Sequence, residues 1–170
     1  MGTTTLRLYS LTSNQAKTYL AAALFVAANI ILPQLCHLIP GGGRMLLPIY
    51  FFTLLGAYKY GWRVGLLTAL LSAPVNCLLF GMPAPAALPV IMVKSLLLAG
   101  AASYAAARSQ RASILTIAAV VLFYQISGSL FEWLWTGSFI AATADFTGGL
   151  PGMVLQAAGV WLLLNSIMKR

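Results

Sequence analysis

The chain has 170 residues, of which 61% are hydrophobic and only 7% are charged. A soluble domain of this size has too little core to bury so many apolar side chains, so the composition predicts a membrane protein. The net charge of +8 could indicate a nucleic-acid-binding protein, but the basic residues form no patch or run. They are spaced one or two at a time between apolar stretches, which is typical of a multispan protein.

Six apolar segments follow one another along the chain, and we expect each to cross the membrane. Most have about the length that a hydrocarbon core of ~30 Å requires. The second has 14 residues between Arg44 and Lys59, which as a helix would cover only ~21 Å. Its length leaves a short helix and a re-entrant piece both open. The expected segments are 18–35, 45–59, 63–81, 87–107, 112–135 and 148–167.

The distribution of basic residues predicts the orientation of these segments. If all six cross and the N-terminus is cytoplasmic, eight basic residues lie on the cytoplasmic side and only Arg44 lies in an outer loop. The eight are Arg7, Lys17, Lys59, Arg63, Arg108, Arg111, Lys169 and Arg170. We therefore expect an all-α integral membrane protein, a bundle of six transmembrane helices that forms one domain over residues 1–170, with both termini in the cytoplasm.

Two charged residues fall inside the expected fourth and fifth spans. Lys94 lies seven residues past Ala87, ~10 Å below the outer boundary, and Glu132 lies ~5 Å below it on the neighbouring span. A charge inside a span is costly unless it has a partner, a water-filled cavity or a function. A structural ion pair between two helices and a binding pocket are both consistent with this placement.

Further polar residues lie at a similar depth. Gln125, Ser129 and Glu132 are spaced i, i+4, i+7 and share one face of the fifth span, while Asn76 lies near the outer end of the third. Because polar groups that face lipid are unfavourable, these side chains are expected to meet inside the bundle. The inner halves of the spans carry no comparable set, which favours a pocket that is open to the outside over a pore. The residues expected to line it are Asn76, Lys94, Gln125, Ser129 and Glu132.

The first outer loop, CHLIPGGGR, is predicted to cover this pocket. Its consecutive glycines Gly41, Gly42 and Gly43 allow backbone conformations that are closed to other residues. His37 in the same loop is either a plain polar loop residue or a contact for a ligand or a metal. The long third outer segment, TGSFIAATADFTGGLPG, is expected to be a loop.

The stretch LLPIYFFTLLGAYKYGWRVGLLTALLSAPVN resembles the second and third helices of the substrate-binding S components of energy-coupling-factor vitamin transporters. The first span contains Ala23 and Ala27, which is similar to the AxxxA motif by which S components contact the transmembrane coupling subunit. Alanines four residues apart form a smooth strip that lets another helix approach closely. The size, the span count and the basic charge agree with this family over nearly the whole chain.

The resemblance implies a high-affinity binding subunit of an ABC-type importer in a prokaryotic cytoplasmic membrane. It implies that the protein captures a vitamin or similar micronutrient from outside and associates with a coupling subunit and two cytoplasmic ATPases. Ala23 and Ala27 would contact the coupling subunit, and His37 and Arg44 would lie at the lid of the pocket. The family itself carries out no chemistry, so no catalytic residue, cofactor or metal is expected.

Other classes of membrane protein fit the sequence less well. Enzymes that generate disulfides need two cysteine pairs, whereas this chain has only Cys36 and Cys77. Metal-dependent phosphotransfer needs several carboxylates, and there are two; the GxSxG motif of serine hydrolases is absent. A solitary small-molecule carrier and a scaffold without ligand remain open alternatives.

Overall fold

The computed structural model describes residues 16–168, apart from the side chains of Arg44, Asp145, Ile167 and Met168. The described chain is helical, as the sequence predicts. Its elements are α1 (Ala16–His37), α2 (Gly42–Leu46), the 3-10 turn η1 (Pro48–Tyr50), α3 (Phe51–Tyr60), α4 (Trp62–Phe80), the 3-10 turn η2 (Pro85–Ala87), α5 (Leu88–Ser109), α6 (Ile114–Thr136), α7 (Phe139–Gly148) and α8 (Leu150–Met168).

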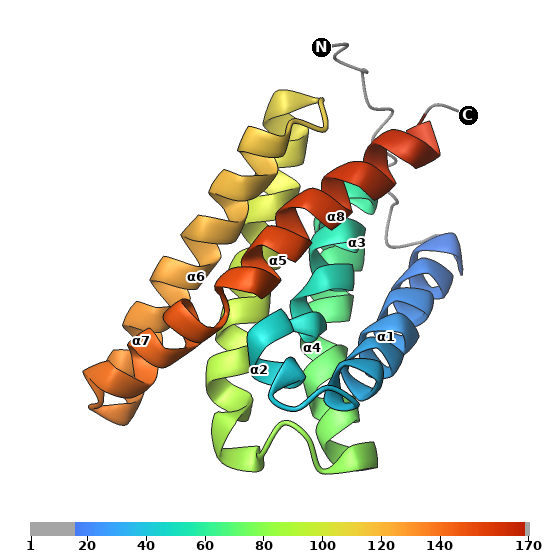
Figure 1. The fold of residues 1–170 in the computed structure, drawn as a ribbon. Helices are drawn as coiled ribbons and strands as arrows, with labels where there is room; N and C mark the ends of the chain where they lie inside the picture. Colours follow the sequence, from blue (N-terminus) through green and yellow to red (C-terminus); the bar gives the residue numbers. More distant parts are fainter. Residues whose placement is uncertain (1–15, 169–170) are drawn as a thin grey trace.

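The helices run back and forth between two ends of the molecule (Figure 1). One end, which we call the turn end, contains the tight α3–α4 and α5–α6 turns, the start of α1 and the end of α8. The other, the loop end, contains the α1–α2 connection, the α4–α5 loop and the corner between α6 and α7. Each long helix therefore carries the chain from one end to the other.

Several helices are long and apolar enough to cross a bilayer. Four segments meet this condition, and the pair α7 and α8 meets it together despite a bend of 47° between them. The four are Ala16–His37, Trp62–Phe80, Pro85–Ser109 and Ile114–Thr136. By helix length and hydropathy, the protein is a multi-pass membrane protein, which confirms that part of the sequence prediction.

The segment expected as a second span at 45–59 is not one continuous helix. α2 ends at Leu46, Leu47 adopts a left-handed conformation with φ 47°, and Pro48 starts a new turn. A proline disfavours the α conformation in the residue before it, which explains the break at this point. α3 has 10 residues and is only ~15 Å long. The broken segment still returns the chain from the loop end to the turn end (Figure 1).

The expected third outer loop is also partly wrong, because residues 139–148 form α7. The stretch contains three alanines among Phe, Ile and Thr, and its threonine hydroxyls bond to carbonyls of the preceding helical turn, as in Thr143 Oγ1 to the Phe139 carbonyl at 2.9 Å. α7 packs against α6 and α8. The bend before α8 falls at Gly148 and Gly149.

α3 lies at the centre of the fold and contacts α1, α4, α5 and α8. Every residue from 53 to 58 is buried, and Leu54 and Tyr58 are fully enclosed. Small residues allow this close packing: a Cβ on Gly65 of α4 would overlap Ala57 of α3. The shortest of the inner helices is therefore the one that the others surround.

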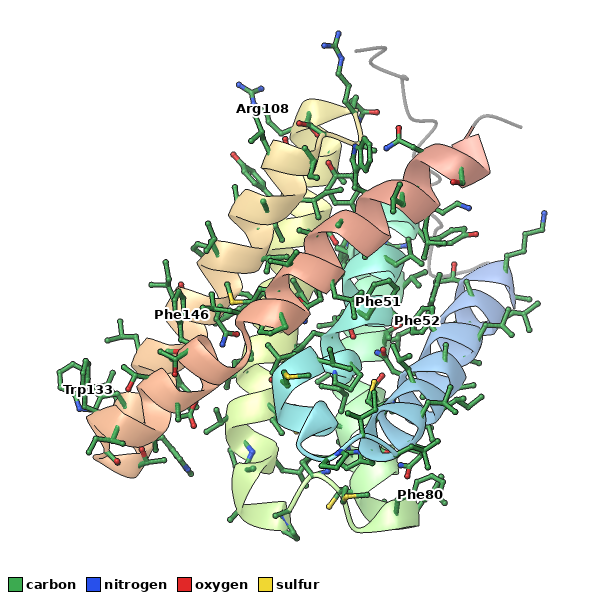
Figure 2. The ribbon with its side chains drawn as sticks, in the orientation of Figure 1. Phe51, Phe52, Phe80, Arg108, Trp133 and Phe146 are labelled. Atoms are coloured by element: carbon green, nitrogen blue, oxygen red, sulfur yellow. The ribbon has the colours of Figure 1, made fainter. Side chains whose placement is uncertain are left out.

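The basic residues that the charge pattern assigns to one side do gather at the turn end. Arg108 is labelled there in Figure 2, and Trp133 lies near the opposite end. The described members of this set are Lys17, Lys59, Arg63, Arg108 and Arg111. Arg7, Lys169 and Arg170 lie outside the described residues.

Candidate functional site

A cavity of about 530 Å³ lies at the loop end of the bundle. Its wall combines the ends of α1, α4, α5 and α6 with the broken segment and the α4–α5 loop. Most of the lining is apolar, for example Pro33, Ile49, Val90 and Ile91. Binding sites for small molecules commonly have this size and a mainly apolar wall with a few polar groups.

Side chains of the hydrophobic core lie between the cavity and the turn end. Leu54, Leu98 and Tyr124, which lie nearer that end on α3, α5 and α6, are fully buried. Their side chains belong to the main hydrophobic core. A pocket that opens only toward the loop end, as the sequence predicts, requires such a floor beneath its polar groups.

An ion pair between α5 and α6 lies at the cavity wall, as the sequence predicts. Lys94 Nζ lies 2.7 Å from Glu132 Oε2. The Lys94 side chain is 1% exposed and is not part of the cavity lining, whereas Glu132 is 14% exposed and does line it. Within one pair, only the carboxylate is presented to the cavity.

Gly128 of α6 provides the space for the lysine. A Cβ at this position would overlap Cγ of Lys94 and would also lie 3.2 Å from Cδ. The aliphatic part of the Lys94 side chain therefore packs on α6 at Gly128, a position without a side chain. Gly128 lies four residues before Glu132 but is not among the site residues predicted from the sequence.

Asn76 lines the cavity from α4, as predicted. Its Oδ1 accepts a hydrogen bond from Gln34 Nε2 of α1 at 3.1 Å. Its Nδ2 group makes no bond to another described residue and remains a donor at the cavity wall. Gln34 thereby orients the asparagine amide, since it uses the acceptor side and leaves the donor side toward the cavity.

His37 lies at the end of α1 and also lines the cavity. Its Nδ1 is 2.6 Å from the carbonyl of Pro33, and because a carbonyl only accepts, Nδ1 carries the hydrogen. Nε2 of a neutral ring is then an acceptor. The ring lies against Gly43, where a Cβ would be 2.7 Å from Nε2.

The structure places the predicted lid only in part. Gly43 lines the cavity; Gly41 and Gly42 do not, although Gly41 adopts the left-handed conformation that favours glycine. Arg44 lies in α2, and its side chain is outside the described part of the chain.

Two of the predicted site residues do not line the cavity. Gln125 is fully buried in α6, seven residues and therefore about two turns nearer to the turn end than Glu132. Ser129 Oγ is also buried, and no described residue is its hydrogen-bond partner. The i, i+4, i+7 pattern therefore places these residues on an inner face of α6 but overstates how far the cavity extends along it.

A second group of buried polar residues was not predicted, and it supports the broken segment. Asn29 of α1 donates to Thr53 Oγ1 at 2.9 Å and to Ser72 Oγ at 3.1 Å, and it accepts from the Phe52 backbone N–H at 3.1 Å. That N–H belongs to the first turn of α3, where no helical partner exists. Figure 2 shows Phe51 and Phe52 at this junction, midway along the bundle.

Gln156 of α8 supports the other side of the break. Its Nε2 donates to the Leu47 carbonyl at 3.2 Å, and its Oε1 accepts from the Tyr124 hydroxyl at 3.0 Å. α8 approaches the backbone of α2 so closely that a Cβ on Gly152 would overlap the Leu46 carbonyl group. The sequence signal for this arrangement was the proline within a span that is too short.

Ala23 and Ala27 are exposed on α1, next to the exposed Leu24. The strip that the AxxxA pattern predicts is therefore on the outer surface of the bundle and not against a neighbouring helix of the same chain.

Cys36 and Cys77 are both free thiols. The described residues contain no group of His, Cys, Asp or Glu that is suited to a metal ion.

Comparisons with protein-family models, with curated proteins and with solved structures found no match for this chain.

Proposed function

We propose that the protein is the substrate-binding S component of an energy-coupling-factor importer, and that it captures a vitamin or similar micronutrient in the cavity at the loop end. The observation that carries this proposal is the 530 Å³ cavity itself, with Glu132, Asn76 and His37 at an otherwise mainly apolar wall. A scaffold without a ligand has no need for polar atoms that remain without a protein partner at the wall of a cavity.

The proposed orientation places the loop end outside the cell and the turn end in the cytoplasm of a prokaryotic cell. The basic residues at the turn end support it, since cytoplasmic loops are enriched in Lys and Arg. In this arrangement the broken segment from α2 to α3 counts as the second of six crossings, and both termini are cytoplasmic. Its buried backbone groups are satisfied by other helices, which is the condition for irregular backbone at membrane depth.

The proposed partners are a transmembrane coupling subunit and two cytoplasmic ATPases. Exposure of Ala23 and Ala27 on α1 supports contact with the coupling subunit, because small side chains on an outer surface let a partner helix approach. In this role the chain itself has no enzymatic activity.

Affinity purification from the native cell membrane, followed by native mass spectrometry, tests the proposal. We expect a retained small molecule together with the coupling subunit and the ATPases. A retained small molecule without partners in repeated preparations would instead indicate a solitary carrier. If neither a small molecule nor the partners are recovered, the proposed function is wrong.

A further inference from the structure

Of the ion pair between Lys94 and Glu132, only Glu132 lines the cavity. Glu132 contributes to the wall with 14% of its side chain exposed, while Lys94 is 1% exposed and lies behind it. The ammonium is held by the 2.7 Å bond to Oε2, and its stem occupies the space above Gly128. A ligand in the cavity therefore meets a carboxylate first.

Three side chains at the cavity wall, those of Glu132, His37 and Asn76, offer a ligand two acceptors and one donor. Among the described residues, Oε1 of Glu132 has no hydrogen-bond partner, because the lysine bonds to Oε2. In the neutral His37 ring, Nε2 is an acceptor because Nδ1 donates to the Pro33 carbonyl. Nδ2 of Asn76 is the donor, since its Oδ1 is already bonded to Gln34.

From this arrangement we infer that the ligand carries a nitrogen donor group toward Glu132, such as an amine, an amidine or an amino-substituted ring, on a compact apolar body. This inference rests on the proposed function and names the chemical class of its substrate. It differs from the simplest expectation for a buried lysine, which is recognition of a carboxylate or phosphate.

Electrostatics separates the two classes of ligand. A ligand anion next to Oε1 would be repelled by the nearest charge, and the attraction of Lys94 is already offset by its own carboxylate partner. A ligand amine instead makes a charge-assisted bond to Oε1, and these bonds are about twice as strong as neutral ones. The mainly apolar wall lowers the local dielectric constant, which strengthens both effects.

A matched pair of small probes tests the inference on the purified full-length protein in detergent. Benzylamine and benzoate share a ring of the same size and differ in the charge of the attached group. We expect benzylamine to raise the thermal unfolding midpoint and to bind with a Kd about tenfold or more below that of benzoate, the range that one charge-assisted bond provides. Equal affinities, a preference for benzoate, or no binding of benzylamine would overturn the inference.

Variants identify the group responsible. Glu132→Gln should remove the preference for benzylamine. If Lys94 recognised an anion, the same change would remove the competing carboxylate and strengthen benzoate binding. Lys94→Met/Glu132→Gln, which leaves no buried charge unpaired, should also show no preference and covers the case in which the single variant does not fold.

The outcome is separable from that of the proposed function. Recovery of the coupling subunit and a retained anionic molecule would support the transporter role while overturning the inferred substrate class. Retention of a nitrogen donor compound without any coupling subunit would have the opposite meaning.

Discussion

Buried polar side chains lie both at the broken segment and at the cavity beside it. At the break, their donor and acceptor groups are bonded within the protein, whereas at the cavity some of these groups have no protein partner among the described residues. Asn29 uses both ends of its amide on the backbone and side chains around the start of α3, and Gln156 does the same at Leu47 and Tyr124. At the cavity, Asn76 and Glu132 each use one side and leave the other toward the cavity.

This difference separates structural polar residues from binding residues without reference to a ligand. An amide whose donors and acceptor are all bonded inside the chain has nothing left for a ligand, and its loss should act on stability. A group that leaves an atom at a cavity wall has a smaller structural role, and its loss should act mainly on binding. The variants below test this distinction in order of their expected effect on stability.

Asn29→Leu should be the most destabilising change. It removes three hydrogen bonds and leaves the Phe52 N–H buried without an acceptor, which we expect to cost about 3 kcal/mol. Unfolding in mixed micelles with increasing denaturing detergent measures the loss. A variant as stable as the parent would mean that the break does not depend on Asn29.

Gln156→Leu should cost about 2 kcal/mol, because the Leu47 carbonyl and the Tyr124 hydroxyl both lose a partner. The matched control is Asn165→Leu on the same helix, whose amide bonds only to the Trp161 carbonyl within α8. Similar losses in the two variants would contradict a special role for Gln156.

Gly128→Ala tests the space that the lysine stem occupies. The added methyl group overlaps Lys94, so we expect a loss of about 1–3 kcal/mol from overpacking, together with weaker ligand retention as the ion pair moves. Gly100→Ala on α5 is the control, because a Cβ there has no neighbour within 4 Å. The contact would be unimportant if both alanine variants behaved alike in the unfolding assay.

Asn76→Leu should have a small effect on stability and a larger one on binding. Only the bond from Gln34 is lost, about 1 kcal/mol, while removal of the donor at the cavity should weaken ligand affinity about tenfold. Isothermal titration with the retained molecule measures the second effect. A variant that loses stability like Asn29→Leu but keeps its affinity would break the distinction between the two regions.

Ala23→Trp should leave both stability and ligand affinity unchanged, because the side chain is exposed on α1 and far from the cavity lining. We expect it to reduce recovery of the coupling subunit in the affinity purification, since a bulky ring prevents close helix approach. Normal recovery would move the proposed interface elsewhere.

The long helices and the ion pair follow from simple properties of the sequence. Long apolar stretches predict α1, α4, α5 and α6 almost to their ends, and depth alone pairs Lys94 with Glu132. Both predictions depend on a single quantity, the position of a residue along a helix axis. This position follows directly from the residue number and the rise per residue.

The rest depends on rotation about the helix axes and on contacts between distant segments. Residues at one depth can face different neighbours, so Asn76 reaches the cavity while Gln125 does not line it. The contact of Gln156 with the Leu47 carbonyl joins residues 109 positions apart, and no local pattern predicts it. The role of Gly128 can be recognised only when its neighbour in the fold, the Lys94 side chain, is known.

The bond from Gln156 also bears on biogenesis. The Leu47 carbonyl has left the translating ribosome long before residue 156 has been made, so the early helices enter the bilayer with this oxygen lacking its final donor. Until α8 is made, the donor to this carbonyl is the Tyr50 N–H of the following turn, at 3.3 Å, and the second donor arrives only with Gln156. A chain released before α8 is made would lack the Gln156 amide that donates to the Leu47 carbonyl at the break.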